Sequence, residues 1–123
     1  MLGDHLRKRR LDLGWFQREV ARQLGITTET ICHWETNQTS PVYRDLPRIF
    51  EFLGYVPFQP GETLSEKLLF SRKILGLSRL KLAKMLGADE GTLLRWERGK
   101  AYPVGNHLKA VEELFGRIGL KVN

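Results

Sequence analysis

The sequence predicts an all-α protein built from two similar helical domains, and three observations support this fold class. When the chain is aligned on itself at an offset of 62 residues without a gap, 16 of the 60 comparable pairs are identical, where ordinary composition would give roughly three or four. Apolar residues recur at helical spacing, and glycine or proline separates the apolar stretches. Each copy is therefore a unit of about sixty residues with a marginal core of its own.

The first helix of each copy is predicted from its apolar face. In copy one this helix spans about residues 2–13, and Gly14 ends it. In copy two, residues 63–66 (Thr-Leu-Ser-Glu) have the spacing of a capping box, in which a hydroxyl and a carboxylate satisfy the free amides of a helix start. Copy one has Met1 in place of Thr63, so we expect its first helix to lack this cap and to fray.

The second and third helices of each copy are short and follow each other closely. The second helix is expected over residues 16–24 in copy one and 78–86 in copy two, and both stretches end in Leu-Gly. The third is expected over residues 28–35 with Thr27 as its N-cap, and Asp89 caps its counterpart. A fourth helix follows in each copy.

The fourth helix is predicted near residues 45–53 and 106–115. Asp45 and Asn106 are natural N-caps for these helices. Pro47 is compatible with a first helical turn, where its missing N–H would have no partner.

The chain thus divides into a first domain at residues 1–53, a Pro/Gly-rich linker at 54–62, a second domain at 63–116 and a tail at 117–123. The tail alternates apolar and polar residues, which is the pattern of a short β-strand. An isolated strand needs a partner for its edge. We expect it to pair with the same tail of a second molecule in a homodimer; the alternative is that it folds back onto its own domain.

Composition and charge favour a polyanionic partner. The net charge is +6 and the isoelectric point is near 9.8, and most of this charge belongs to copy two. Residues 1–61 hold 8 basic and 7 acidic side chains, whereas residues 62–123 hold 12 and 7. The single cysteine, Cys32, excludes an intrachain disulfide. No apolar run approaches the roughly 18 residues of a membrane span and no signal core is present, so we expect a cytoplasmic protein.

A tight helix-turn-helix is predicted inside each copy. Its inward face in copy one consists of Val20, Ala21, Leu24, Ile31 and Trp34, and copy two repeats this set as Leu82, Ala83, Leu86, Leu93 and Trp96. Ala21 must be small because the following helix crosses over it, and Gly25 permits the positive φ of a sharp turn. The third helix then keeps an outward face that suits the major groove.

The stretches LGWFQREVARQLGITTETICHWETN and LGLSRLKLAKMLGADEGTLLRWERGK resemble the helix-turn-helix domains of Cro and phage repressors (the XRE type), as a tandem pair over nearly the whole chain. The resemblance implies two lambda-repressor-like bundles of four to five helices that bind double-stranded operator DNA. The family's usual glutamine at the start of the second helix is Gln17, but copy two has Arg79. The Trp-Glu-x-Gly ending is complete in copy two, whereas copy one has Asn37, which also tolerates left-handed geometry.

Site residues follow from the resemblance by position. The predicted base contacts are Thr28, Glu29, Cys32 and His33 in copy one and Glu90, Gly91, Leu94 and Arg95 in copy two. The predicted phosphate contacts are Gln17, Thr30, Asn37, Arg79, Thr92, Arg98 and Lys100. Arg95 is the best single candidate, because its guanidinium fork suits O6 and N7 of guanine. The acidic Glu29, Asp89 and Glu90 would repel phosphates unless they find a specific base.

The resemblance also implies an ion pair within each domain, between Arg10 and Glu35 and between Arg72 and Glu97. No catalytic constellation, cofactor motif or metal-ligand spacing is found, so we expect neither an enzyme nor a metal protein. We interpret the chain as a sequence-specific transcriptional regulator. Two alternatives stay open: an antitoxin-like autorepressor, and a protein-interaction adaptor whose helix-turn-helix units no longer bind DNA.

Overall fold

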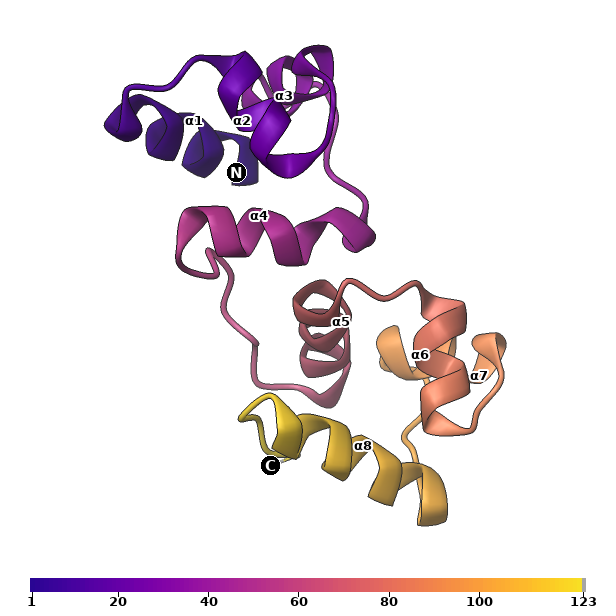
Figure 1. Cartoon of the computed structure of the whole chain (residues 1–123). Coiled ribbons are helices and arrows are strands. Elements are labelled where there is room, and N and C mark those ends of the chain that lie inside the picture. Colours follow the sequence, from indigo (N-terminus) through magenta and orange to yellow (C-terminus); the bar gives the residue numbers. More distant parts are fainter. Residues whose placement is uncertain (123) are drawn as a thin grey trace. The chain divides into compact units, whose positions relative to one another are not determined.

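The structure, a computed structural model, describes residues 1–122 (Figure 1). Its contacts divide the chain into two compact units, Met1–Pro57 (unit 1) and Phe58–Asn123 (unit 2). The described residues form eight α-helices and one 3-10 helix and contain no β-strand. The predicted all-α class is therefore confirmed.

Unit 1 is a small bundle with one core. Its elements are α1 (Leu2–Leu13), α2 (Gln17–Leu24), α3 (Thr28–Glu35), the 3-10 helix η1 (Tyr43–Asp45) and α4 (Leu46–Leu53). α3 packs on α1 and α2, and α4 packs on the same two helices. Its buried apolar residues are Leu6, Val20, Ala21, Leu24, Ile31, Trp34, Leu46, Ile49, Phe50 and Leu53.

Unit 2 repeats this order of helices. Its elements are α5 (Leu64–Leu75), α6 (Arg79–Leu86), α7 (Glu90–Glu97) and α8 (Gly105–Arg117). The first three helices have the lengths of α1, α2 and α3, namely 12, 8 and 8 residues. Its core consists of Leu64, Leu68, Leu82, Ala83, Leu86, Leu93, Trp96, Val111, Leu114 and Phe115.

The predicted caps of the first and third helices are confirmed. Thr27 Oγ1 accepts a hydrogen bond from the backbone N–H of Thr30 at 3.1 Å, and Asp89 Oδ1 accepts one from that of Thr92 at 2.6 Å. Thr63 forms the capping box that begins α5, whereas no side-chain cap begins α1. These local signals fix where α3, α5 and α7 start.

Neither predicted cap of a fourth helix forms a cap hydrogen bond, although Asp45 does occupy the N-cap position of α4. Asp45 has helical backbone angles at the end of η1, and its carboxylate binds Arg48 Nη2 at 2.9 Å. Helix α8 begins one residue earlier than predicted, so Asn106 lies inside its first turn and caps nothing. Pro47 does lie in the first turn of α4.

The predicted strand in the tail is also wrong for the described residues 117–122; Asn123 lies outside them. Gly54 ends α4 with a φ of 81°, but Gly116, its partner in the repeat, continues the helix to Arg117. Gly119 then takes a φ of 78°, and the N–H of Leu120 donates to the carbonyl of Phe115 at 2.7 Å. The tail therefore turns back at the end of α8.

The tail is held on unit 2 by two kinds of contact. Leu120 and Val122 pack against the core, and buried Lys67 donates from Nζ to the carbonyl of Lys121 at 2.6 Å. The alternating pattern arises because every second residue faces the core of the same unit. Residues 117–122 contain no strand that could pair with the tail of a second molecule. Homodimerisation itself stays a prediction.

None of the helices in residues 1–122 is long and apolar enough to cross a membrane.

Candidate nucleic-acid interface

The turn between α2 and α3 has the geometry that the small residues predict. Gly25 ends α2 with a φ of 70°, and Gly87 ends α6 with a φ of 72°. Ala21 and Ala83 are buried where the next helix packs. Each turn thus joins two eight-residue helices closely enough that one face of the second is buried and the other is exposed.

A buried ion pair joins the first helix to the end of the third in unit 1. Arg10 Nε and Nη2 donate to the two carboxylate oxygens of Glu35 at 2.7 and 2.8 Å. The hydrogen bonds that Arg10 donates to this carboxylate raise the pKa of its guanidinium above the ordinary value, against an opposing effect of burial. Gln17 Nε2 also donates to Glu35, at 3.2 Å. The first residue of α2 is therefore tied to the last residue of α3.

The same site in unit 2 carries an additional positive charge. Arg72 Nη1 donates to both oxygens of Glu97 at 2.9 Å, and Arg79 Nε donates to one of them at 3.0 Å. Arg79 Nη1 also lies 4.0 Å from Glu90 Oε1. Arg79, a predicted phosphate contact, thus bridges the buried carboxylate and the first residue of α7.

The predicted base contacts share the outward faces of α3 and α7. In unit 1 Thr28 and Glu29 are exposed, and Cys32 and His33 are half-buried. In unit 2 Glu90, Gly91 and Arg95 are exposed, and Leu94 is half-buried. The guanidinium of Arg95 is steadied by a hydrogen bond from Nη2 to Thr92 Oγ1 at 3.1 Å.

Two of the three acidic residues near these faces have a local partner. Hydrogen bonds from the backbone and side chain of Thr92 hold the pKa of Asp89 below its ordinary value. Glu90 faces Arg79, as described above. No partner for the Glu29 carboxylate is found among residues 1–122. Repulsion between an unpaired carboxylate and DNA phosphates is therefore expected mainly in unit 1.

The remaining predicted phosphate contacts lie within α3 and α7 or in the segments that follow these helices. Asn37 adopts a φ of 60°, as its replacement of glycine requires, and its Nδ2 donates to Asp4 at 3.1 Å. In unit 2 Gly99 has a φ of 71°, and the flanking Arg98 and Lys100 are exposed. Thr30 and Thr92 are half-buried beside their caps.

Sequence reasoning missed the residues that fix the ends of these helices. A Cβ on buried Gly3 would collide with the backbone carbonyl of Trp34, whereas Ser65, the repeat partner of Gly3, donates to the carbonyl of Trp96 at 2.9 Å. His107 Nε2 lies 3.1 Å from the carbonyl of Gly87, and its ring packs on Trp96. The sequence repeat at offset 62 pairs Gly3 with Ser65. Only the packing of the first helix against the end of the third shows why unit 1 has a glycine at this position.

Cys32 is a free, half-buried thiol beside His33. Among the described residues no three His, Cys, Asp or Glu side chains are grouped to hold a metal ion.

A protein-family model described as a helix-turn-helix domain matches residues 1–57, which is the whole of unit 1. No curated protein and no solved structure matches the chain. The match indicates that unit 1 is a helix-turn-helix domain, a class of domain that commonly binds DNA. Unit 2 lies outside the matched residues. Its likeness to unit 1 is geometric, because it repeats the same helices, the same turn and the same buried ion pair.

Proposed function

We propose that this protein is a sequence-specific regulator of transcription that binds double-stranded DNA through two non-identical recognition helices, α3 and α7. The observation that carries this proposal is the fixed outward face of each helix. Trp34 and Trp96 are buried at 5% and 3% exposure on the inner side, while the residues predicted to contact bases lie on the outer side. A helix held in this way can enter the major groove as a rigid element.

Unit 2 is expected to provide most of the attraction to DNA. Arg95, Arg98 and Lys100 are exposed, whereas the same positions in unit 1 hold His33, Thr36 and Gln38. Cations near phosphates release condensed counterions, so affinity should depend on these side chains and fall as salt rises. Unit 1 contributes chiefly through the shape and hydrogen bonds of α3.

Arg79 supports a reading role for Glu90. A free carboxylate at the start of α7 would repel phosphates, but the Arg79 guanidinium lies 4.0 Å from it. Unit 1 has the neutral pair Gln17 and Thr28 at these positions. Unit 2 thus has an additional cation, Arg79, next to its additional anion, Glu90. Because the guanidinium offsets the negative charge near the phosphates, Glu90 can accept a hydrogen bond from cytosine N4.

The direct test is a selection of the full chain on random duplex DNA, followed by anisotropy titrations at several salt concentrations. A single enriched motif and an affinity that falls steeply with salt are expected. If no motif is enriched and the weak binding is the same for all duplexes, sequence-specific regulation is wrong.

A second function is favoured for unit 1 by one observation. The outward face of α3 holds no Lys or Arg, and it carries Glu29, for which no partner is found within residues 1–122. Such a face suits a protein partner better than a phosphate backbone. Glu29→Ala distinguishes the two functions: altered base preference at one position supports DNA reading by α3, and an unchanged motif with an unchanged salt slope supports an adaptor role for unit 1.

A further inference from the structure

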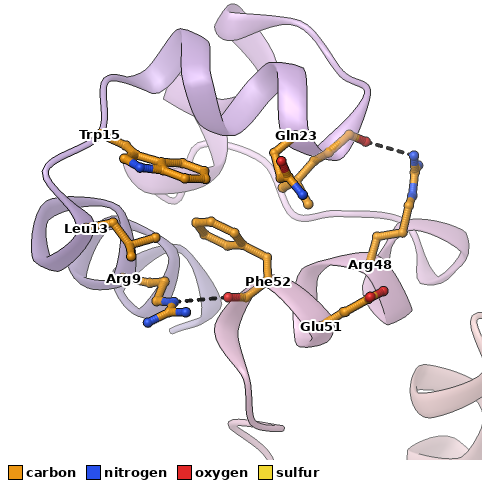
Figure 2. A pocket seen from close by; sticks show the side chains of 8 residues that line it. Arg9, Leu13, Trp15, Gln23, Arg48, Glu51 and Phe52 are labelled. Atoms are coloured by element: carbon orange, nitrogen blue, oxygen red, sulfur yellow. Dashed lines mark hydrogen bonds between the residues drawn. The ribbon is translucent and has the colours of Figure 1, made fainter.

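Unit 1 contains a hollow that the DNA-binding geometry does not use (Figure 2). Its volume is about 430 Å³, and it lies between the end of α1, Trp15, the end of α2 and α4. Ligand sites for small molecules commonly have volumes of ~300–1,000 Å³. The residues of unit 1 that line it include none of the predicted base or phosphate contacts.

One side of the hollow is aromatic. The rings of Trp15 and Phe52 are both half-buried, with centroids 5.9 Å apart and planes inclined by 37°. Arg9 donates from Nε to the carbonyl of Phe52 at 3.1 Å and steadies this end of α4. Figure 2 shows the two rings facing the same space, with Leu13 beside them. Such a surface suits another aromatic ring, in a tilted or offset arrangement.

The other side of the hollow carries charges of both signs. Arg48 and Glu51 stand one turn apart on α4, and Gln23 faces them from α2. Arg48 is fixed by bonds to the carbonyl of Leu24 at 2.8 Å and to Asp45 at 2.9 Å, and its fork has further N–H groups to donate. Within residues 1–122 no hydrogen-bond partner is found for the Glu51 carboxylate or the Gln23 amide.

The repeat shows that the fold does not require this set of side chains. At the positions of Trp15, Gln23, Arg48 and Phe52, unit 2 has Leu77, Met85, Ala110 and Leu114. Unit 2 nevertheless forms the same helices and the same turn. The aromatic pair and the cation are therefore specific to unit 1. Among the polar and aromatic residues that line the hollow, only Glu51 has an identical counterpart, Glu113.

We propose that this hollow binds a free aromatic amino acid. The ligand's ring lies against Trp15 and Phe52, its carboxylate accepts from Arg48, and its ammonium donates to Glu51. A free amino acid has both charges on one carbon and its ring one methylene away, which matches a site with Arg48 and Glu51 on one side and the two rings, next to Arg9, on the other. Because charge-assisted hydrogen bonds are the stronger ones, the two charges of the ligand provide much of the selectivity.

The test is a titration of L-phenylalanine into the ¹⁵N-labelled full chain, followed by NMR. The indole signal of Trp15 and the amides of α4 should shift together, with a dissociation constant on the order of 1 mM, as the size of the ligand implies. L-leucine lacks the ring and N-acetyl-L-phenylalaninamide lacks both charges, so each should bind at least about tenfold more weakly. If neither signal moves at roughly ten times the expected dissociation constant, or if the uncharged amide binds as well as the free amino acid, the proposal is wrong.

Matched variants locate the site. Glu51→Gln should weaken binding about tenfold, while Glu113→Gln, the same change at the repeat partner, should leave it unchanged. Phe52→Leu installs the residue that unit 2 tolerates at this position, and it should remove binding while the amide spectrum stays that of a folded chain. Equal effects of the two glutamate changes, or full binding by the Phe52 variant, would overturn the assignment.

Discussion

Glu97 connects three helices through one carboxylate. It lies at the end of α7, accepts from Arg72 on α5, and accepts from Arg79 at the start of α6. Its side chain is only 3% exposed, so these bonds replace the water that a carboxylate would otherwise bind. The orientation of α7 against α5 and α6, and with it the direction of the outward face, depends on this group.

Replacing Glu97 by glutamine should therefore destabilise unit 2 strongly. The change leaves two arginines facing a neutral amide, and breaking a buried pair from one side costs about 3 kcal/mol. Amide hydrogen exchange in α5, α6 and α7 reports the stability of unit 2 by itself. Glu113→Gln, on an exposed surface, is the control and should change stability by less than about 0.5 kcal/mol. Equal protection in both variants would show that the ion pair contributes little.

Arg95 and Lys100 should affect DNA binding in different ways. If Arg95 reads guanine, Arg95→Ala should cost about 1–3 kcal/mol on the selected site and relax the preference at one base pair. Lys100→Ala should weaken binding to all sequences alike and lower the salt slope by about one. Anisotropy titrations on the selected and a scrambled duplex measure both effects. An unchanged motif after Arg95→Ala would mean that Arg95 is not a base contact.

At the level of elements, α3 and α7 each begin with a side-chain cap that also orders the first turn of the helix. Asp89 accepts from the backbone of Thr92, and Arg95 donates to the hydroxyl of Thr92 one turn later. In unit 1 Thr27 performs the capping role with a neutral hydroxyl. Of these two helices, only α7 therefore has a cap with a titratable charge.

The Asp89 cap predicts a pH dependence of unit 2. Because the folded pKa of Asp89 is lowered, its stabilising contribution is present above the unfolded value of about 3.9 and is lost as pH falls through the folded pKa. Asp89→Ala should therefore lower the stability of unit 2 at pH 7, and the difference from the parent should shrink below about pH 4. Thermal unfolding over this pH range measures it. A difference that stays constant down to pH 2 would rule out the charged cap as its source.

The elements differ in how far the sequence alone predicts them. Thr27, Asp89 and Thr63 were predicted correctly as caps because a cap bonds to residues two or three positions away. The two glycines Gly54 and Gly116 are identical and occupy the same place in the repeat, yet one ends a helix and the other continues it. That difference depends on packing of the following residues against a core, which no local pattern contains.

The same reasoning applies to the candidate site. The exposure of Arg95 follows from the helical periodicity of α7, since its neighbours Leu93 and Trp96 are apolar. The bond from Arg79 to Glu97 joins residues 18 positions apart, and the contact of Arg79 with Glu90 crosses the turn between two helices. From the sequence, Arg79 is predicted only to contact phosphates. Its contacts with Glu97 and Glu90 cannot be predicted in this way, because the direction of a side chain across a turn is set by how the helices pack.

For the whole molecule, the chain between the units is attached on both sides. The Tyr55 hydroxyl and Nδ1 of His5 on α1 share a hydrogen bond of 2.7 Å, and the ammonium of Lys73 on α5 lies 4.5 Å from the ring centre of Phe58. Val56 and Pro57 lie between these two anchors, and proline restricts the backbone further. If both units bind DNA together, we expect them to accept only a narrow range of half-site spacings.

Inserting four Gly-Ser residues between Pro57 and Phe58 should broaden that range. A longer flexible connection samples more separations and lowers the effective concentration of the second unit, so affinity for the preferred spacing should fall a few-fold while other spacings become acceptable. A selection on duplexes in which the two half-sites are separated by variable lengths compares the parent and the insertion variant. Tyr55→Phe, which removes only the bond to His5, should broaden the range less. If the parent already accepts every spacing equally, the two units do not bind one composite site, and α7 alone accounts for the specificity.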